Sequence, residues 1–182
     1  YGYHRTFDLL QSAWQEDPTF IGEEILRVAY PKEFFTMIQA EAKRTKIPPL
    51  LILSLMRQES TFRPEALSPA TAMGLMQVVP TTAREVAGDM RLKAYQSPAD
   101  LFSPDVNIKI GSTYLQRLLK AFDGHVPLAL ASYNAGIGNI KSWLSNRDDL
   151  KDIKSQANSK IETEIWYDEI PWLETSGYIK SI

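Results

Sequence analysis

The sequence predicts a mostly α-helical protein in one lobe, with room for a small β-hairpin near Ser68. Hydrophobic residues recur every three or four positions along most of the chain, whereas the strict alternation of a half-buried strand is scarce. The 182 residues suffice for one compact domain with a hydrophobic core. Hydrophobic residues make up 44% of the chain and charged residues 23%, proportions that are typical of globular proteins.

Prolines and apolar periodicity outline the first half of the chain. Residues 6–30 read as two short amphipathic helices, and Tyr30-Pro31 opens a helix that we expect to run to about Lys43. Pro48 and Pro49 suit the first turn of the next helix, where a missing N–H does no harm. Residues 50–56 are apolar on nearly every face, which predicts a helix in the core.

Similar signals outline the second half. Ser103-Pro104-Asp105 combines an N-cap with a first-turn proline, and a long apolar stripe follows at Val106, Ile110, Tyr114, Leu118 and Phe122. A further helix follows Pro127 and should stop at Gly136, a natural left-handed C-cap. A short helix carries Ile140, Trp143 and Leu144, and residues 145–160 read as a polar surface loop or insertion.

Composition argues against several classes of function. The formal net charge is −2 and the pI is about 5.8, without a run of Lys or Arg, so a nucleic-acid partner is not expected. The absence of cysteine removes a thiol nucleophile and thiolate ligands, and the two histidines, His4 and His125, are not spaced as metal ligands. No metal or cofactor is therefore predicted. No apolar stretch reaches the length of a membrane span, so the chain is not expected to cross a membrane.

One glutamate lies at the edge of an apolar helix face. Ile52, Leu55, Met56 and Glu59 are spaced i, i+3, i+4 and i+7, which places them on one stripe. Burial and the negative end of the helix dipole should both raise the pKa of this carboxyl. A carboxyl that stays protonated near neutral pH can act as a general acid. On spacing alone, a solvated helix-end glutamate remains the alternative.

Three motifs around Glu59 carry a resemblance to a known family. Glu59-Ser60 is followed by Ser68-Pro69, by residues 74–77 (Gly-Leu-Met-Gln), by Pro80 and by residues 132–138, which include Tyr133-Asn134-Ala135-Gly136. In order and spacing they resemble the soluble lytic transglycosylases, whose domains carry Glu-Ser, Gly-Leu-Met-Gln and Ala-Tyr-Asn-Ala-Gly. The resemblance runs from about Tyr30-Pro31 to the C-terminus and implies a goose-type-lysozyme-like helical domain over residues 30–182. Residues 1–29 are then a helical linker or the remnant of an upstream helical domain.

The resemblance also implies roles for individual residues. Glu59 matches the family's acid/base, and Ser60 is expected to help hold the helix end. The remaining matches are expected to contact the substrate; they are Ser68, Met76, Gln77, Tyr133, Asn134, Asp168 and Tyr178. For Met76, packing in the core is an equal alternative. Gly74 and Gly136 are expected to serve tight backbone geometry.

The C-terminal stretch departs from the family pattern at three positions, of which the replacement of Phe by Trp172 is the mildest. Residues 168–178 resemble the family's Glu-x-Ile-Pro-Phe-x-Glu-Thr-Arg-x-Tyr, but Asp168 stands in place of Glu and Ser176 in place of Arg. The first change shortens a carboxylate by one methylene. The second removes a bidentate donor that could brace a neighbouring carboxylate.

The function that the resemblance implies is cleavage of peptidoglycan glycan strands in the bacterial periplasm or cell envelope, by a monomer. The expected reaction breaks the β-1,4 bond between N-acetylmuramic acid and N-acetylglucosamine and leaves a 1,6-anhydro end, with Glu59 as single acid/base. Two alternatives stay open. One is a lysozyme-type hydrolase on the same fold, in which water attacks, and the other is an inactive peptidoglycan-binding module.

Overall fold

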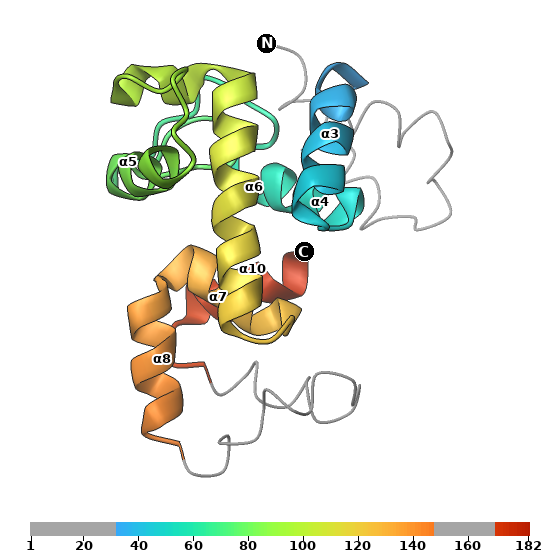
Figure 1. Cartoon of the computed structure of the whole chain (residues 1–182). Coiled ribbons are helices and arrows are strands. Elements are labelled where there is room, and N and C mark those ends of the chain that lie inside the picture. The colour runs from blue at the N-terminus through green and yellow to red at the C-terminus, as the bar shows by residue number, and fades with distance from the viewer. Residues whose placement is uncertain (1–31, 148–169) are drawn as a thin grey trace, which may run out of the picture. The chain divides into compact units, whose positions relative to one another are not determined.

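All regular elements in the described part of the chain are helices (Figure 1). The computed structural model describes residues 32–147 and 170–182. The chain divides between Ser112 and Thr113 into two compact units, and the boundary falls inside the longest helix, α6 (Pro104–Ala121). The mostly helical class is thus confirmed, and the expected single lobe is refined into two units that share one continuous helix.

The described part of the first unit, from residue 32 on, contains five further helical elements. They are η2 (Lys32–Phe34), α3 (Phe35–Thr45), α4 (Pro49–Ser60), α5 (Pro80–Asp89) and η3 (Pro98–Phe102). Helix α3 packs on α4, and α5 contacts η3. Pro49 and Pro80 occupy the first turns of α4 and α5, as expected of a residue without an N–H. The sequence did not predict η3, which begins with a capping box between Ser97 and Asp100.

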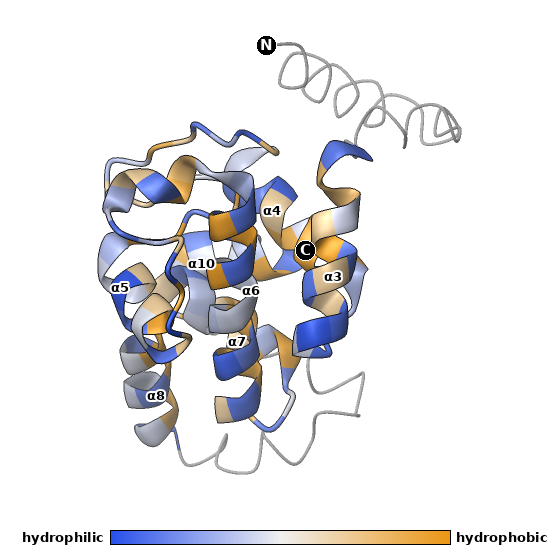
Figure 2. Ribbon diagram, turned by 45° about the horizontal axis from the view of Figure 1, so that its top comes forward, coloured by the Kyte–Doolittle hydropathy of each residue, from blue (hydrophilic) through white to orange (hydrophobic). Residues whose placement is uncertain are grey.

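The predicted core helix is confirmed as α4, with one exception at its start. Four of its apolar residues are buried; they are Ile52, Leu53, Leu55 and Met56. Leu50, however, is 73% exposed, because it lies in the first turn, outside the packed face. Hydrophobic and hydrophilic bands alternate along the helices in Figure 2, as expected where each helix buries one stripe.

The small β-hairpin expected near Ser68 does not form. The described residues contain only two isolated antiparallel bridges, Leu67 with Met73 and Met73 with Val78. Left-handed backbone conformations at Thr71 (φ 62°), Gly74 (φ 76°) and Gln77 (φ 44°) interrupt the segment every third residue. A strand cannot extend through such positions, so the segment folds into successive turns.

Among its described residues, the second unit holds the end of α6 and three further helices, α7 (Val126–Ala135), α8 (Ile137–Ser145) and α10 (Leu173–Ser181). Helix α7 packs against α8 and α10. The imidazole of His125 accepts the Leu128 N–H and so caps α7 at its start. The predicted stop at Gly136 is confirmed, but its φ of 88° and ψ of 136° lie outside the left-handed helical region. The helix therefore ends at a positive φ that glycine adopts without steric cost.

Several sequence predictions fall outside the described residues. They concern the two helices within residues 6–30, the linker at residues 1–29, the loop beyond residue 147, His4 and Asp168. Helix α8 extends to Ser145, so the predicted loop begins after that residue. None of the helices that the structure describes combines the length and the apolar character of a membrane span.

Candidate active site

Glu59 is the penultimate residue of α4, and its side chain is half-buried. The three residues that precede it on the same stripe, Ile52, Leu55 and Met56, have no exposed surface. The predicted placement of a carboxyl at the end of a buried helix face is therefore confirmed. Such a position gives a carboxyl access to solvent on one side while the core fixes its backbone.

The backbone just beyond Glu59 is strained. Thr61 (φ 49°) and Phe62 (φ 59°) adopt left-handed conformations in succession, which is costly for β-branched and bulky side chains. Phe62 is buried, and the Arg63 guanidinium donates to the Ser60 carbonyl at 3.1 Å. Conformations of this kind persist only where surrounding contacts impose them, so the end of α4 is held firmly.

A single peptide group links the end of α4 to α6. The carbonyl between Leu75 and Met76 accepts a hydrogen bond from the Ser60 hydroxyl at 2.7 Å. The N–H of the same peptide group donates to the Asn107 side chain at 2.7 Å. Ser60 and Asn107 are buried, so these bonds are shielded from water. We call this arrangement the peptide clamp; it ties the residue next to Glu59 to the loop and to α6.

Both polar atoms of the Asn107 side-chain amide form hydrogen bonds in this region. Its NH₂ group donates to the carbonyls of Met73 and Leu101, each at 2.8 Å. A Cβ atom at Gly74 would overlap the Leu101 carbonyl oxygen and the Asn107 amide, and the φ of Gly74 is positive as well. Gly74 was expected to serve tight backbone geometry, and the cause is the close approach of its Cα atom to the Asn107 side chain and the Leu101 carbonyl. Asn107 was not predicted from the sequence, although an asparagine directly beside the start of the long apolar stripe is an available signal.

Gln77 and Ser68 brace the same loop. The Gln77 amide nitrogen donates to the carbonyls of Gly74 at 2.8 Å and Ala66 at 3.1 Å. The Ser68 hydroxyl accepts the Ala72 N–H at 3.0 Å and closes a turn. Both side chains are half-buried. Each therefore has a structural role in the loop, whatever substrate contact it makes besides.

Met76 lies in the core. Its side chain has no exposed surface and packs so closely on α6 that a Cβ at Gly111 would lie 2.6 Å from the Met76 sulfur. Of the two roles that the sequence left open for Met76, the structure favours packing. Two residues that lie one helical turn apart on α6 thus accommodate Met76. Asn107 accepts its backbone N–H, and Gly111 leaves room for its side chain.

The second unit contains the other motif residues. Tyr133 and Asn134 lie at the end of α7, and the Tyr133 ring packs against Tyr114 with centroids 5.3 Å apart. The buried Thr175 hydroxyl donates to the Asn134 side-chain oxygen at 2.6 Å, which leaves the amide NH₂ on the other side. The sequence motif includes Thr175, but no role for this residue was predicted from the sequence. Tyr178 is only 6% exposed, so its ring belongs to the core of this unit.

The structure therefore groups the predicted residues into two sets. The peptide clamp in the first unit brings together Ser60, Gly74, Met76 and Gln77. In the second unit, the Thr175 hydroxyl holds the Asn134 side chain. Within residues 32–147 and 170–182, no group of three His, Cys, Asp or Glu side chains could hold a metal ion.

One further carboxylate is buried among the described residues. Glu41 on α3 is 8% exposed, and its carboxylate accepts the Arg44 guanidinium at 2.7 Å and the Ser112 hydroxyl at 3.2 Å. A carboxylate paired and hydrogen-bonded in this way joins α3 to α6. Its Oε2 atom is therefore engaged in holding the two helices together.

Comparisons with known proteins identify a family and several similar proteins. Residues 36–156 match the family model described as the transglycosylase SLT domain. The soluble lytic murein transglycosylase of Escherichia coli strain K12 is 31% identical over 157 residues, which cover 86% of this chain and 23% of that protein.

Two solved structures are also similar. The 70 kDa soluble lytic transglycosylase from Escherichia coli superposes with a TM-score of 0.75 at 28% identity, over 100% of this chain and 27% of the other. An inactive Glu-to-Gln mutant of lytic transglycosylase Slt from Pseudomonas aeruginosa gives a TM-score of 0.75 at 29% identity, over 98% and 28%. The chain thus spans about a quarter of the length of these relatives.

Proposed function

Because the chain belongs to the transglycosylase SLT domain family, we propose that it cleaves peptidoglycan without adding water. The bond that breaks is the β-1,4 bond between N-acetylmuramic acid and N-acetylglucosamine. The observation that carries the proposal is the half-buried Glu59 at the end of α4, next to the peptide clamp. The inactive Pseudomonas aeruginosa mutant supports it, because a Glu-to-Gln change accompanies inactivity in that relative.

A single carboxyl suffices for this reaction. Protonated Glu59 donates its proton to the glycosidic oxygen as the bond from that oxygen to C1 breaks. The 2-acetamido carbonyl of the muramic sugar stabilises the positive charge on C1, as in substrate-assisted glycosidases. The Glu59 carboxylate then removes the proton of the sugar's own 6-hydroxyl, whose oxygen bonds to C1. The products are a 1,6-anhydromuramyl end and a free 4-hydroxyl, and Glu59 is protonated again.

The other motif residues position the reacting groups. The peptide clamp of Ser60 and Asn107 holds the backbone from which Glu59 reaches the substrate. The Asn134 amide, oriented by Thr175, has its NH₂ group available to donate to an N-acetyl carbonyl. Tyr133 offers an aromatic face to a sugar ring. Ser68, Gln77, Asp168 and Tyr178 remain proposed contacts of the bound strand, with Tyr178 requiring a shift to become accessible.

The test is product analysis with purified peptidoglycan. We expect 1,6-anhydromuramyl ends by mass spectrometry, and we expect Glu59→Gln to lower the rate by roughly 10²- to 10⁴-fold. Glu33→Gln, an exposed glutamate in η2, is the matched control and should retain the wild-type rate. A Glu59→Gln variant with near-wild-type turnover would refute the assignment.

The same experiment separates the alternatives. Reducing-end products that depend on Glu59 indicate a lysozyme-type hydrolase on this fold, and binding without release of fragments indicates a recognition module. The proposed setting is the bacterial periplasm or cell envelope, where the substrate lies, with the chain acting as a monomer. No cofactor takes part in the proposed steps, because the proton moves between Glu59 and the sugar alone.

A further inference from the structure

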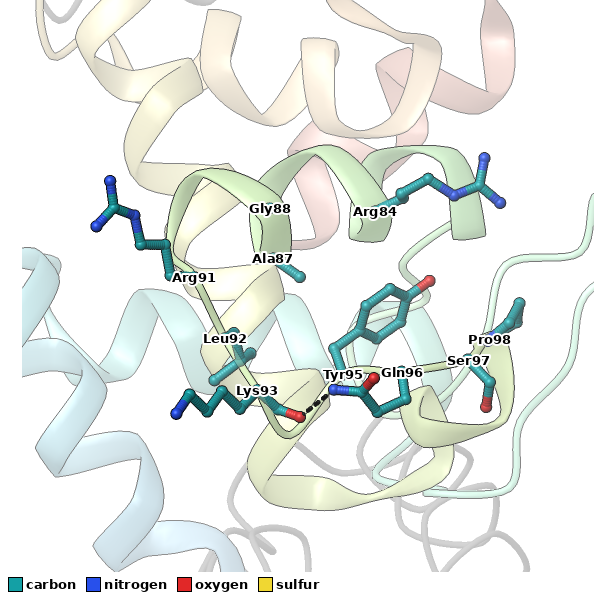
Figure 3. A pocket seen from close by; sticks show the side chains of 10 residues that line it. All are labelled: Arg84, Ala87, Gly88, Arg91, Leu92, Lys93, Tyr95, Gln96, Ser97 and Pro98. Carbon is teal, nitrogen blue, oxygen red and sulfur yellow. Dashed lines mark hydrogen bonds between the residues drawn. The ribbon is translucent and has the colours of Figure 1, made fainter.

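The described residues hold polar side chains in two contrasting ways. A hollow of about 510 Å³ lies beside α5, and Figure 3 shows that the side chains of Arg84, Arg91 and Lys93 extend to different sides of it. These three cations therefore do not converge on one ligand atom. In the second unit, by contrast, one buried hydroxyl fixes the side-chain amide of Asn134, so the direction of the remaining hydrogen bonds of that amide is defined.

The backbone that carries Asn134 is braced at the end of α7. Asn134 is the penultimate residue of this helix, and the Gly136 N–H closes the last turn on the Ser132 carbonyl at 3.0 Å. The Ala135 carbonyl accepts the Asn139 side-chain amide at 2.8 Å. Helix α7 also packs against α10. The backbone at Asn134 is therefore held, and the remaining question is which polar atom of its side chain faces outward.

Thr175 on α10 settles the orientation of that amide. Its side chain is buried, and its hydroxyl donates to Asn134 Oδ1 at 2.6 Å. The buried Thr45 differs, because its hydroxyl donates to the Glu41 carbonyl of its own helix at 2.7 Å. A hydroxyl has one proton to donate, and Thr175 gives it to the oxygen of the amide. The half-buried Asn134 side chain therefore presents its NH₂ group, which is a donor only, on the other side.

We propose that Thr175 is a positioning residue that makes the site select N-acetylated over de-N-acetylated sugars. The inference rests on the proposed function, in which the Asn134 NH₂ group donates to an N-acetyl carbonyl. A sugar without its acetyl group carries an amine at the same place, and a protonated amine can only donate. It would face the Asn134 NH₂ group donor against donor, and the bond to Thr175 keeps the amide from turning its oxygen outward.

The test compares the binding of two peptide-free glycan strands, one N-acetylated and one chemically de-N-acetylated. Binding is measured by calorimetry with Glu59→Gln as the parent, because this variant is expected to leave the strands uncut. Adding Thr175→Val removes the hydroxyl and keeps the shape of the side chain. The preference for the N-acetylated strand should then fall at least about fivefold, because the amide can turn and accept from the amine. Thr175→Ser keeps the hydroxyl and should retain the preference of the parent.

A second variant and a matched control complete the set. Asn134→Asp presents an oxygen outward while its other oxygen still accepts the Thr175 hydroxyl, so it should prefer the de-N-acetylated strand, and it decides the question if Thr175→Val does not fold. The control is Thr45→Val in the first unit, which makes the same substitution at a buried threonine whose hydroxyl bonds within its own helix. It should keep the preference of the parent.

Several results would overturn the inference. They are a parent that does not bind the N-acetylated strand more tightly, an unchanged preference in Thr175→Val or Asn134→Asp, and an equal fall in Thr175→Val and in either Thr175→Ser or Thr45→Val. Cleavage of the N-acetylated strand by the wild type is recorded separately. Its absence refutes the proposed reaction, whereas the binding preferences still decide the role of Thr175.

Discussion

The peptide clamp predicts that Ser60 and Asn107 stabilise the protein cooperatively. Ser60→Ala leaves the Leu75 carbonyl without its buried donor, which should cost about 1–2 kcal/mol. Asn107→Ala removes the side-chain partner of three backbone groups, the Met76 N–H and the carbonyls of Met73 and Leu101. The bonds to Met76 and Leu101 are buried, so the substitution should cost about 3–5 kcal/mol. Because both side chains hold one peptide group, either substitution alone loosens the bond to the other.

The assay is a double-mutant cycle on the free energy of unfolding, measured by urea denaturation of the wild type, the two single variants and the double variant. We expect the double variant to lose at least about 0.5 kcal/mol less than the sum of the single losses. Costs that add to within about 0.3 kcal/mol would contradict the shared clamp. A Thr113→Ala substitution, elsewhere on α6, serves in a parallel cycle with Ser60→Ala and should show additive behaviour.

Three further predictions concern single positions. Gly74→Ala should destabilise the protein by about 3 kcal/mol or more, measured by denaturation, because the added Cβ overlaps backbone and the φ is positive. Burial lowers the pKa of His125 below its ordinary value of 6.5. As the pH drops through 6.5, the unfolded chain therefore binds a proton at this histidine before the folded protein does, and the free energy of unfolding should decrease. His125→Asn, which keeps a capping acceptor, should flatten that dependence in thermal melts at pH 5 to 8; an unchanged slope would exclude His125 as its source. Ser132 is buried, and its hydroxyl has no partner among the described residues, so Ser132→Ala should raise the stability by about 1 kcal/mol, and a lower melting temperature would contradict this.

Local signals in the sequence predicted several helix boundaries correctly, although α5 and η3 were not predicted. Proline positions marked the starts of α4 and α6, and Gly136 marked the end of α7. These signals act through the backbone of the residue itself, so neighbours in space hardly alter them. The placement of Glu59 followed in the same way, because helical periodicity alone fixes which residues share a stripe.

Features that depend on contacts between distant residues could not be predicted. Asn107 meets Met76 across 31 residues of chain, and no local pattern reveals that pairing. The expected hairpin failed at Thr71 and Gln77, where residues other than glycine adopt positive φ values because side-chain hydrogen bonds hold the turns. The burial of Tyr178 likewise depends on the packing of α10 against α7.

The Gly-Leu-Met-Gln motif owes its residue types mainly to the support of α4. Gly74 allows close approach to Asn107, the Leu75 carbonyl receives Ser60, Met76 fills the core, and the Gln77 amide holds two carbonyls of its own loop. Such a motif would be retained by an inactive module as well, since it stabilises the fold. The match at residues 74–77 therefore supports the architecture, whereas the case for catalysis depends on the Glu59 carboxyl that this architecture holds in place.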